Sequence, residues 1–169
     1  MMRLYGWAWR RALAGRSGAL TLVFQFWIPF NRPHRFRIAS LASGSAEVVA
    51  PFRRSNRNHL GTVHACAMAT VGEFVAGLAL LGAFDPTEYR LIMSHMEVEY
   101  KRRAVTQIRS RAALSEDDLA EVRWLLKEHG LTTRVLTSSL MDDAGEEVAV
   151  VRTNWQIKAW GRIEGKVGS

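Results

Sequence analysis

The hydrophobic and polar residues of this chain recur with different periods, and the changes of period divide the sequence into elements. From Phe36 to Phe52 apolar residues alternate with polar ones around a Ser-Gly-Ser turn, which predicts a β-hairpin. Residues 63–81 are apolar almost throughout and rich in Ala and Gly. This segment predicts a long helix buried against a sheet, ending before Asp85 and Pro86.

Alternation returns at residues 89–100 and predicts a strand. One face of this strand is expected to carry Ile92, Met96, Val98 and Tyr100, and the other His95, Glu97 and Glu99. Residues 104–114 predict a second strand, with Val105 and Ile108 as its apolar anchors.

The last third of the chain predicts a short helix and a second hairpin. Ser115 begins a capping box, the apolar spacing that follows is helical, and Gly130 ends the helix. Residues 132–141 and 147–160 form the hairpin around an Asp-Asp-Ala-Gly turn. The order of elements predicts an α+β fold in which a curved antiparallel sheet wraps one long helix.

The first thirty residues allow two interpretations. Arginines followed by the ten apolar residues 19–28 resemble a signal peptide, but no small-residue cleavage site follows and the run is too short to span a bilayer. We therefore expect one or two N-terminal helices that cover the domain and can touch a membrane surface through Trp7 and Trp9. The predicted organisation is a helical extension (1–34), one domain (35–160) and a flexible tail (161–169).

Composition narrows the class of protein. The chain is 48% hydrophobic and 23% charged, which is typical of a globular domain. Cys66 is the only cysteine, so one chain cannot hold a disulfide or a cysteine-rich zinc site, and we expect no metal and a cytoplasmic location. The net charge of +7 suits an anionic partner, which could be nucleic acid, anionic lipid or a phosphate-bearing small molecule, unless it is only a solvated face. No nucleic-acid-binding motif is present, so we expect no nucleic acid.

The candidate chemistry lies where the long helix begins. Asn58 and His64 flank a turn at Gly61, and Glu73 follows inside the apolar helix. A carboxylate in such surroundings is costly to bury without a partner, and burial raises its pKa toward that of a useful base. The free amides at a helix N-terminus can bind an oxyanion. Structural roles remain open: an ion-paired Glu73, a turn residue at Asn58 and a helix-capping His64.

The spacing of Asn58, His64 and Glu73, placed between a hairpin and the central helix, resembles the hotdog thioesterase superfamily. Within it, the chain is similar to the phenylacetic-acid-type acyl-CoA thioesterases and to the family DUF4442, over residues 35–160. The resemblance implies a hotdog fold assembled as a homodimer or a homotetramer formed by two dimers.

The resemblance also implies roles for individual residues. Asn58 would orient the substrate or water, His64 would shape the turn, and the Ala65 N–H would bind the thioester carbonyl. Glu73 of the opposite subunit would act as general base or nucleophile. The sequence departs from the family by having Ala65 and Cys66 after the histidine, where two glycines are usual.

The predicted ligand is an acyl-CoA or acyl-carrier thioester, with CoA present only as part of the substrate. Arg102 and Arg103 are the candidate binding residues for CoA phosphate, because the planar fork of arginine suits phosphate. A second candidate patch contains Arg53, Arg54 and Arg57. Two alternatives to hydrolysis are a non-catalytic acyl- or lipid-binding protein and a hydratase or dehydratase on the same fold, the latter disfavoured by the absence of its motif.

Overall fold

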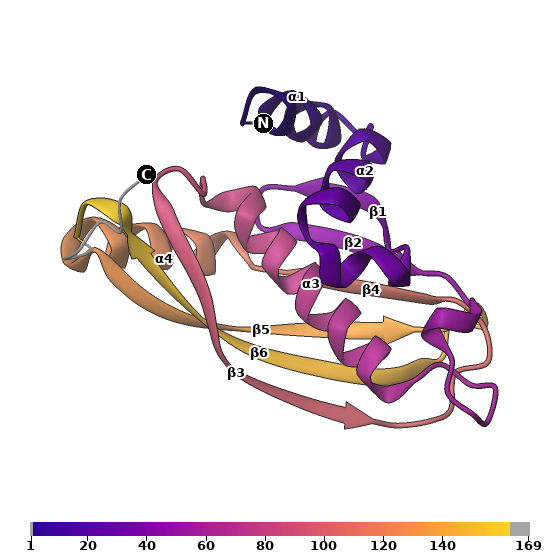
Figure 1. The fold of residues 1–169 in the computed structure, drawn as a ribbon. Helices are drawn as coiled ribbons and strands as arrows, with labels where there is room; N and C mark the ends of the chain where they lie inside the picture. Colours follow the sequence, from indigo (N-terminus) through magenta and orange to yellow (C-terminus); the bar gives the residue numbers. More distant parts are fainter. Residues whose placement is uncertain (1, 163–169) are drawn as a thin grey trace.

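The computed structural model describes residues 2–162 and contains one antiparallel sheet of six strands in the order β1-β2-β4-β5-β6-β3. The long helix α3 runs across one face of this sheet, as Figure 1 shows. The strands are β1 (Arg37–Ala42), β2 (Ser45–Ala50), β3 (Tyr89–Tyr100), β4 (Ile108–Ala113), β5 (Leu131–Met141) and β6 (Glu147–Ala159). The helices are α1 (Met2–Leu13), α2 (Gly18–Trp27), α3 (Ala65–Ala83) and α4 (Glu116–His129), with short 3-10 turns η1 (Pro29–His34), η2 (Arg54–Asn56) and η3 (Trp160–Arg162).

Small residues let α3 lie very close to the sheet. A Cβ atom added at Gly72 would lie 2.4 Å from Val151 Cγ2, and one added at Gly82 would lie 2.3 Å from the Ala42 carbonyl oxygen. The buried Ser138 hydroxyl on β5 donates a hydrogen bond to the Gly72 carbonyl at 2.8 Å. The helix is long and apolar enough to span a bilayer, but most of its residues are buried in the protein.

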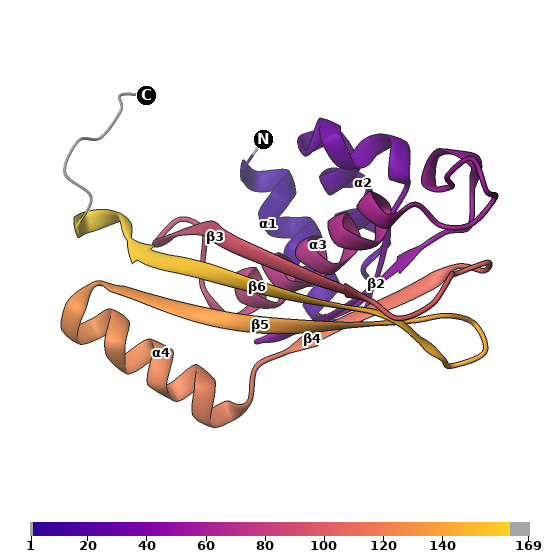
Figure 2. The same ribbon diagram turned by 90° about the horizontal axis from the view of Figure 1, so that it is seen from below.

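The capping signals predicted for the second helix are confirmed. Ser115 accepts a hydrogen bond from the Asp118 N–H, the Asp118 carboxylate accepts one from the Ser115 N–H, and Gly130 ends α4 with a φ of 70°. Arg134 of β5 forms ion pairs with Asp118 and Glu121. Because β4 stops at Ala113, α4 lies beside the first part of β5 (Figure 2).

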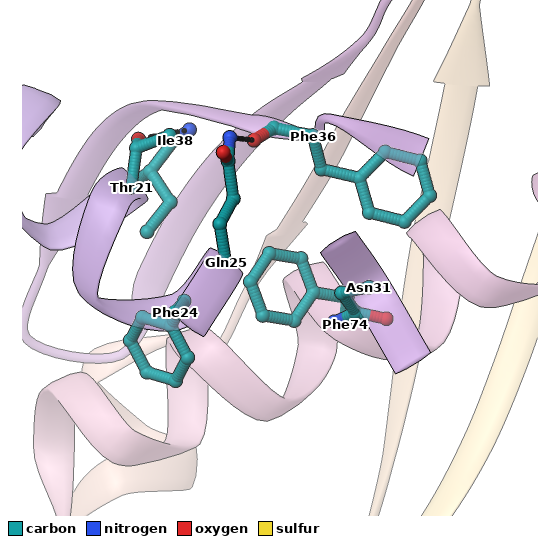
Figure 3. A pocket seen from close by; sticks show the side chains of 7 residues that line it. All are labelled: Thr21, Phe24, Gln25, Asn31, Phe36, Ile38 and Phe74. Carbon is teal, nitrogen blue, oxygen red and sulfur yellow. Dashed lines mark hydrogen bonds between the residues drawn. The ribbon is translucent and has the colours of Figure 1, made fainter. Parts of the chain in front are cut away.

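The N-terminal helices cover the β1 edge of the sheet, and they lie on the same side of it as α3 (Figure 2). The Thr21 hydroxyl accepts a hydrogen bond from the Ile38 N–H at 3.0 Å, and the Gln25 side chain donates to the Phe36 carbonyl at 3.3 Å (Figure 3). The Ser17 hydroxyl donates to the Ile38 carbonyl. Polar side chains of α2 thus bond backbone groups of the β1 edge, and the β3 edge is the one left open among the described residues.

Aromatic packing joins α2 to the central helix. Phe74 of α3 makes an edge-to-face contact with Phe24, with ring centroids 5.6 Å apart, and it stacks on Phe36 at 6.1 Å. The small cavity between them, shown in Figure 3, holds about 10 Å³. A cavity of this size has room for about one water molecule, so it is a packing gap and no ligand site.

Two details of the predicted strands are wrong. Ile92 lies on the face opposite to Met96, because a bulge between Met93 and His95 changes the register against β6. Val105 anchors no strand: β4 begins at Ile108, and the Val105 side chain is exposed. The central helix begins two residues later than predicted and ends two residues later. Of the predicted flexible tail, residues 163–169 lie outside the described residues.

Candidate functional site

The first turn of α3 contains a backbone N–H group, that of Ala65, which is free to bind a ligand. His64 is the N-cap, and its Nδ1 accepts the Cys66 N–H at 3.0 Å, so the ring acts here as a helix cap. The Ala65 N–H has no acceptor among the residues that the structure describes. Tyr100 at the end of β3 donates its hydroxyl to the Ala65 carbonyl at 3.1 Å, and burial raises the pKa of that hydroxyl. His64, Ala65 and Cys66 are exposed, so this N-terminus is open to an anionic ligand.

Asn58 is bound within its own loop. Its side-chain oxygen accepts the N–H groups of Leu60 and Thr62 at 3.0 and 3.2 Å, and its amide donates to the Thr62 hydroxyl at 2.9 Å. Gly61 takes a φ of 76°, a conformation that favours glycine. Asn58 therefore holds the turn that leads into α3, and its side-chain amide is already hydrogen-bonded within the single chain.

Glu73 is the unpaired charge of the central helix. Its carboxylate forms no hydrogen bond or ion pair with any of the described residues, and burial raises its pKa above the ordinary value of 4.5. It lines a pocket of about 300 Å³. An acid held in apolar surroundings with an elevated pKa is a recognised feature of functional sites.

The pocket beside Glu73 is mostly apolar and contains residues that the sequence interpretation missed. Phe24 and Ile28, at the end of α2, form part of its wall, together with Trp155 of β6 and Trp160 of η3. The sequence feature that could have pointed to Trp155 is Gly77 of α3, because a Cβ atom added there would lie 3.2 Å from the indole. The remaining lining residues are Phe74, Gly77, Leu78, Leu81, Pro86, Tyr89, Arg90 and Leu91.

The two ends of the candidate site are separated within one chain. Ala65 and Glu73 are eight residues apart on α3, which corresponds to about 12 Å along the helix axis. A carbonyl oxygen bound at the Ala65 N–H is therefore out of reach of the Glu73 carboxylate of the same chain. One chain holds both groups but does not bring them together.

The candidate phosphate-binding arginines are exposed and differ in their contacts. Arg102 forms an ion pair with Glu146 at 2.7 Å, and Arg103 forms none within the described part of the chain. The Arg57 guanidinium lies 5.1 Å from the centre of the Phe52 ring, and the neighbouring Arg53 and Arg54 are exposed. Within residues 2–162, no cluster of three or more His, Cys, Asp or Glu side chains could hold a metal ion.

A six-stranded antiparallel sheet curved around one long helix is the hotdog fold, which confirms the predicted fold class. The chain belongs to the family DUF4442, a domain of unknown function, whose sequence profile matches residues 16–157. No curated protein matches the sequence.

Solved structures show the same architecture. A Pseudomonas aeruginosa protein of unknown function, described as a probable thioesterase, is 25% identical with a TM-score of 0.74, covering 83% of this chain and 94% of its own. A variant of a Staphylococcus aureus thioesterase is 17% identical with a TM-score of 0.65, over 77% of this chain and 98% of its own. A Haemophilus influenzae thioesterase is 11% identical with a TM-score of 0.62, over 77% and 82%.

Proposed function

We propose that this protein is a thioester hydrolase that acts on acyl-CoA or acyl-carrier thioesters. The observation that carries the proposal is Glu73, an unpaired carboxylate with a raised pKa on the wall of an apolar pocket. The pocket suits an acyl chain, and the carboxylate suits activation of water or direct attack on the thioester carbonyl. The structural similarity to a probable thioesterase from Pseudomonas aeruginosa and to a thioesterase from Staphylococcus aureus supports the same class of reaction.

The free Ala65 N–H is the proposed oxyanion donor. It lies at the positive end of the α3 dipole, so it would stabilise the charge that develops on the thioester oxygen. Glu73 would come from a second copy of the chain, because about 12 Å of helix separates the two groups in one copy. Exposed Arg103 is a candidate contact for CoA phosphate.

The open β3 edge is the proposed dimer interface. The strand is twelve residues long, and within residues 2–162 it pairs on one side only, with β6. Met96 and Tyr100, on the face that points toward α3, are 38% and 47% exposed. A long unpaired edge with exposed apolar side chains invites pairing with another strand. Pairing with the same strand of a second copy would form a symmetric dimer.

Release of free thiol across a panel of acyl-CoA chain lengths tests the reaction. We expect Glu73→Gln to lower turnover by about 100- to 10,000-fold, the usual cost of losing a general base. Glu128→Gln is the matched control, because that exposed glutamate on α4 lies outside the pocket. Wild-type rates in Glu73→Gln would refute the assignment.

The oxyanion donor can be removed without a change in helix geometry. Proline is well tolerated at the first position of a helix, and His64 already has the extended backbone that precedes proline. Ala65→Pro therefore deletes one N–H that no described residue accepts. We expect a loss of about 100- to 1,000-fold in turnover with an unchanged melting temperature.

Mixing the two variants tests the composite site. If each site takes Glu73 from one copy and the Ala65 N–H from the other, a mixed dimer of Glu73→Gln and Ala65→Pro contains one intact site. After co-refolding, about a quarter of wild-type activity should return from two inactive parents. Continued inactivity of a mixture shown to contain mixed dimers would place both groups in the same chain.

Asn58 favours a second candidate function. Its amide is bound to its own loop, so in this chain it does not reach out to hold an attacking water. A protein that binds acyl groups without hydrolysing them would need the pocket but not that contact. Tight binding of a fluorescent fatty acid, with no thiol released from any acyl-CoA, would favour this alternative.

A further inference from the structure

The positive charge of the protein is concentrated at its N-terminus. Residues 1–46 contain seven arginines, and Glu47 is the first acidic residue of the chain. In the rest of the sequence, 16 basic residues balance 16 acidic ones, so the first 46 residues account for the whole net charge of +7. Within the described residues, none of Arg10, Arg11, Arg16 and Arg32 forms an ion pair.

The same segment exposes large apolar side chains. On α2, Leu20 and Phe24 are buried, whereas Leu22 and Phe26, on the opposite side of the helix, are 57% and 72% exposed. Phe30, in the turn that follows, is 68% exposed. Neighbouring large apolar side chains that are exposed in this way mark a surface for a partner or a membrane. We call Leu22, Phe26 and Phe30 the outer face of α2.

Arginines stand next to these exposed rings. The Arg32 guanidinium lies 5.6 Å from the centre of the Phe26 ring, and the Arg11 guanidinium lies 5.0 Å from the centre of the Trp7 ring on α1. Trp7 is 45% exposed. Helices that lie on anionic membranes combine aromatic and aliphatic side chains with Arg or Lys in this way, so that the rings enter the headgroup region beside the cations.

We propose that α1, α2 and η1 form a docking surface for an anionic lipid bilayer. The positive charge of this surface favours anionic lipid over a second copy of the chain, because two such surfaces face to face would place arginines opposite arginines. Anionic headgroups neutralise them, and the outer face of α2 enters the boundary with the acyl chains. The hydrogen bonds of Thr21 with the Ile38 N–H and of Gln25 with the Phe36 carbonyl attach this surface to the domain.

The proposed surface lies next to the pocket. Phe24 and Ile28 line the pocket from the same segment that carries the outer face of α2. Docking would therefore hold the pocket close to the bilayer. If the proposed function is correct, this position makes acyl thioesters that partition into membranes the natural substrates. The docking itself does not rest on the proposed function.

Sedimentation of the full chain with lipid vesicles tests the proposal without any measurement of activity. The vesicles contain phosphatidylcholine alone or with roughly one third phosphatidylglycerol. We expect binding to the anionic vesicles that weakens as salt is added. Retention of the protein in the supernatant with anionic vesicles at low salt would overturn the proposal.

Two variants locate the surface. Phe26→Ser with Phe30→Ser should weaken vesicle binding by roughly 10- to 100-fold, and Arg10→Gln with Arg11→Gln by about fivefold per arginine. Trp124→Ser, which removes an exposed ring from α4, is the control and should bind as the wild type does. If the phenylalanine variant keeps its vesicle binding but loses mass in light scattering, a second copy covers this face and the proposal is wrong.

Discussion

The helices α2 and α3 are both largely apolar, yet they have opposite surroundings. α3 is enclosed by the sheet and carries one acid, Glu73, whose charge nothing in the described chain neutralises. α2 has one side against the domain and one side open, and it carries no acid at all. Apolar composition alone therefore does not place a helix in a core. The two helices differ in the number of their sides that other segments of the chain cover.

The difference also separates two kinds of site. In α3, a polar group is held in an apolar environment, which changes its chemistry by raising its pKa. In α2, apolar groups are held in a polar, positively charged environment, which suits adhesion to a surface. The first arrangement fits catalysis and the second fits localisation, and the pocket wall shared by the two helices links them.

Truncation of one leucine on each side of α2 should give the largest difference in stability. Leu20 is fully buried and Leu22 is 57% exposed. We expect Leu20→Ala to cost about 2–5 kcal/mol of unfolding free energy, because it leaves a cavity. Leu22→Ala should change stability by less than about 0.5 kcal/mol. Urea denaturation measures both, and equal costs would mean that another element covers the outer face of α2.

Glycine substitutions test how closely α2 and α3 pack against their neighbours. A Cβ atom at Gly82 of α3 would meet the Ala42 carbonyl, which is backbone and cannot rotate away, whereas Gly18 of α2 has open space around it. We expect Gly82→Ala to cost about 1–3 kcal/mol. Gly18→Ala should be neutral or stabilising by up to about 1 kcal/mol, because alanine favours the helix. Thermal melts followed by circular dichroism compare the two, and a neutral Gly82→Ala would contradict the close contact.

The raised pKa of Glu73 predicts a smaller, pH-dependent effect on stability. The unfolded chain ionises this carboxyl near pH 4.5, while the folded chain keeps the proton to higher pH. Stability is therefore lost as the pH rises through that window. Glu73→Gln should raise the melting temperature at pH 7 and leave it nearly unchanged below pH 4.5. A variant that is less stable than the wild type at pH 7 would show that the charge has a partner.

The same pKa predicts a shift in the pH profile of the proposed reaction. A general base works only when it is ionised, so kcat/KM should fall on acidification at a pH above the usual range of a glutamate. Initial rates of thiol release between pH 4 and 9, flanking the ordinary value of 4.5, measure this limb. A limb at or below pH 4.5 would contradict the assignment of Glu73 as a buried base.

Local patterns were enough to predict most of the elements. The capping box at Ser115, the stop at Gly130 and the apolar run of α3 depend on neighbours in sequence, and the structure confirms them. The alternation of apolar and polar residues also predicts most of the strands and the side chains that share a face of each strand. Ile92 is the exception, because the bulge before His95 is defined by pairing with β6 and moves Ile92 to the other face.

Periodicity, caps and residue types are local properties, so the amino-acid sequence was enough to predict the α+β class, the central helix and the chemical identity of the candidate groups. Tertiary packing directs the Asn58 amide into its own loop and places Phe24 and Ile28 in the pocket wall. It also left Leu22 and Phe26 uncovered while Leu20 and Phe24 are buried. These outcomes depend on contacts between segments distant in the chain, which no local pattern encodes.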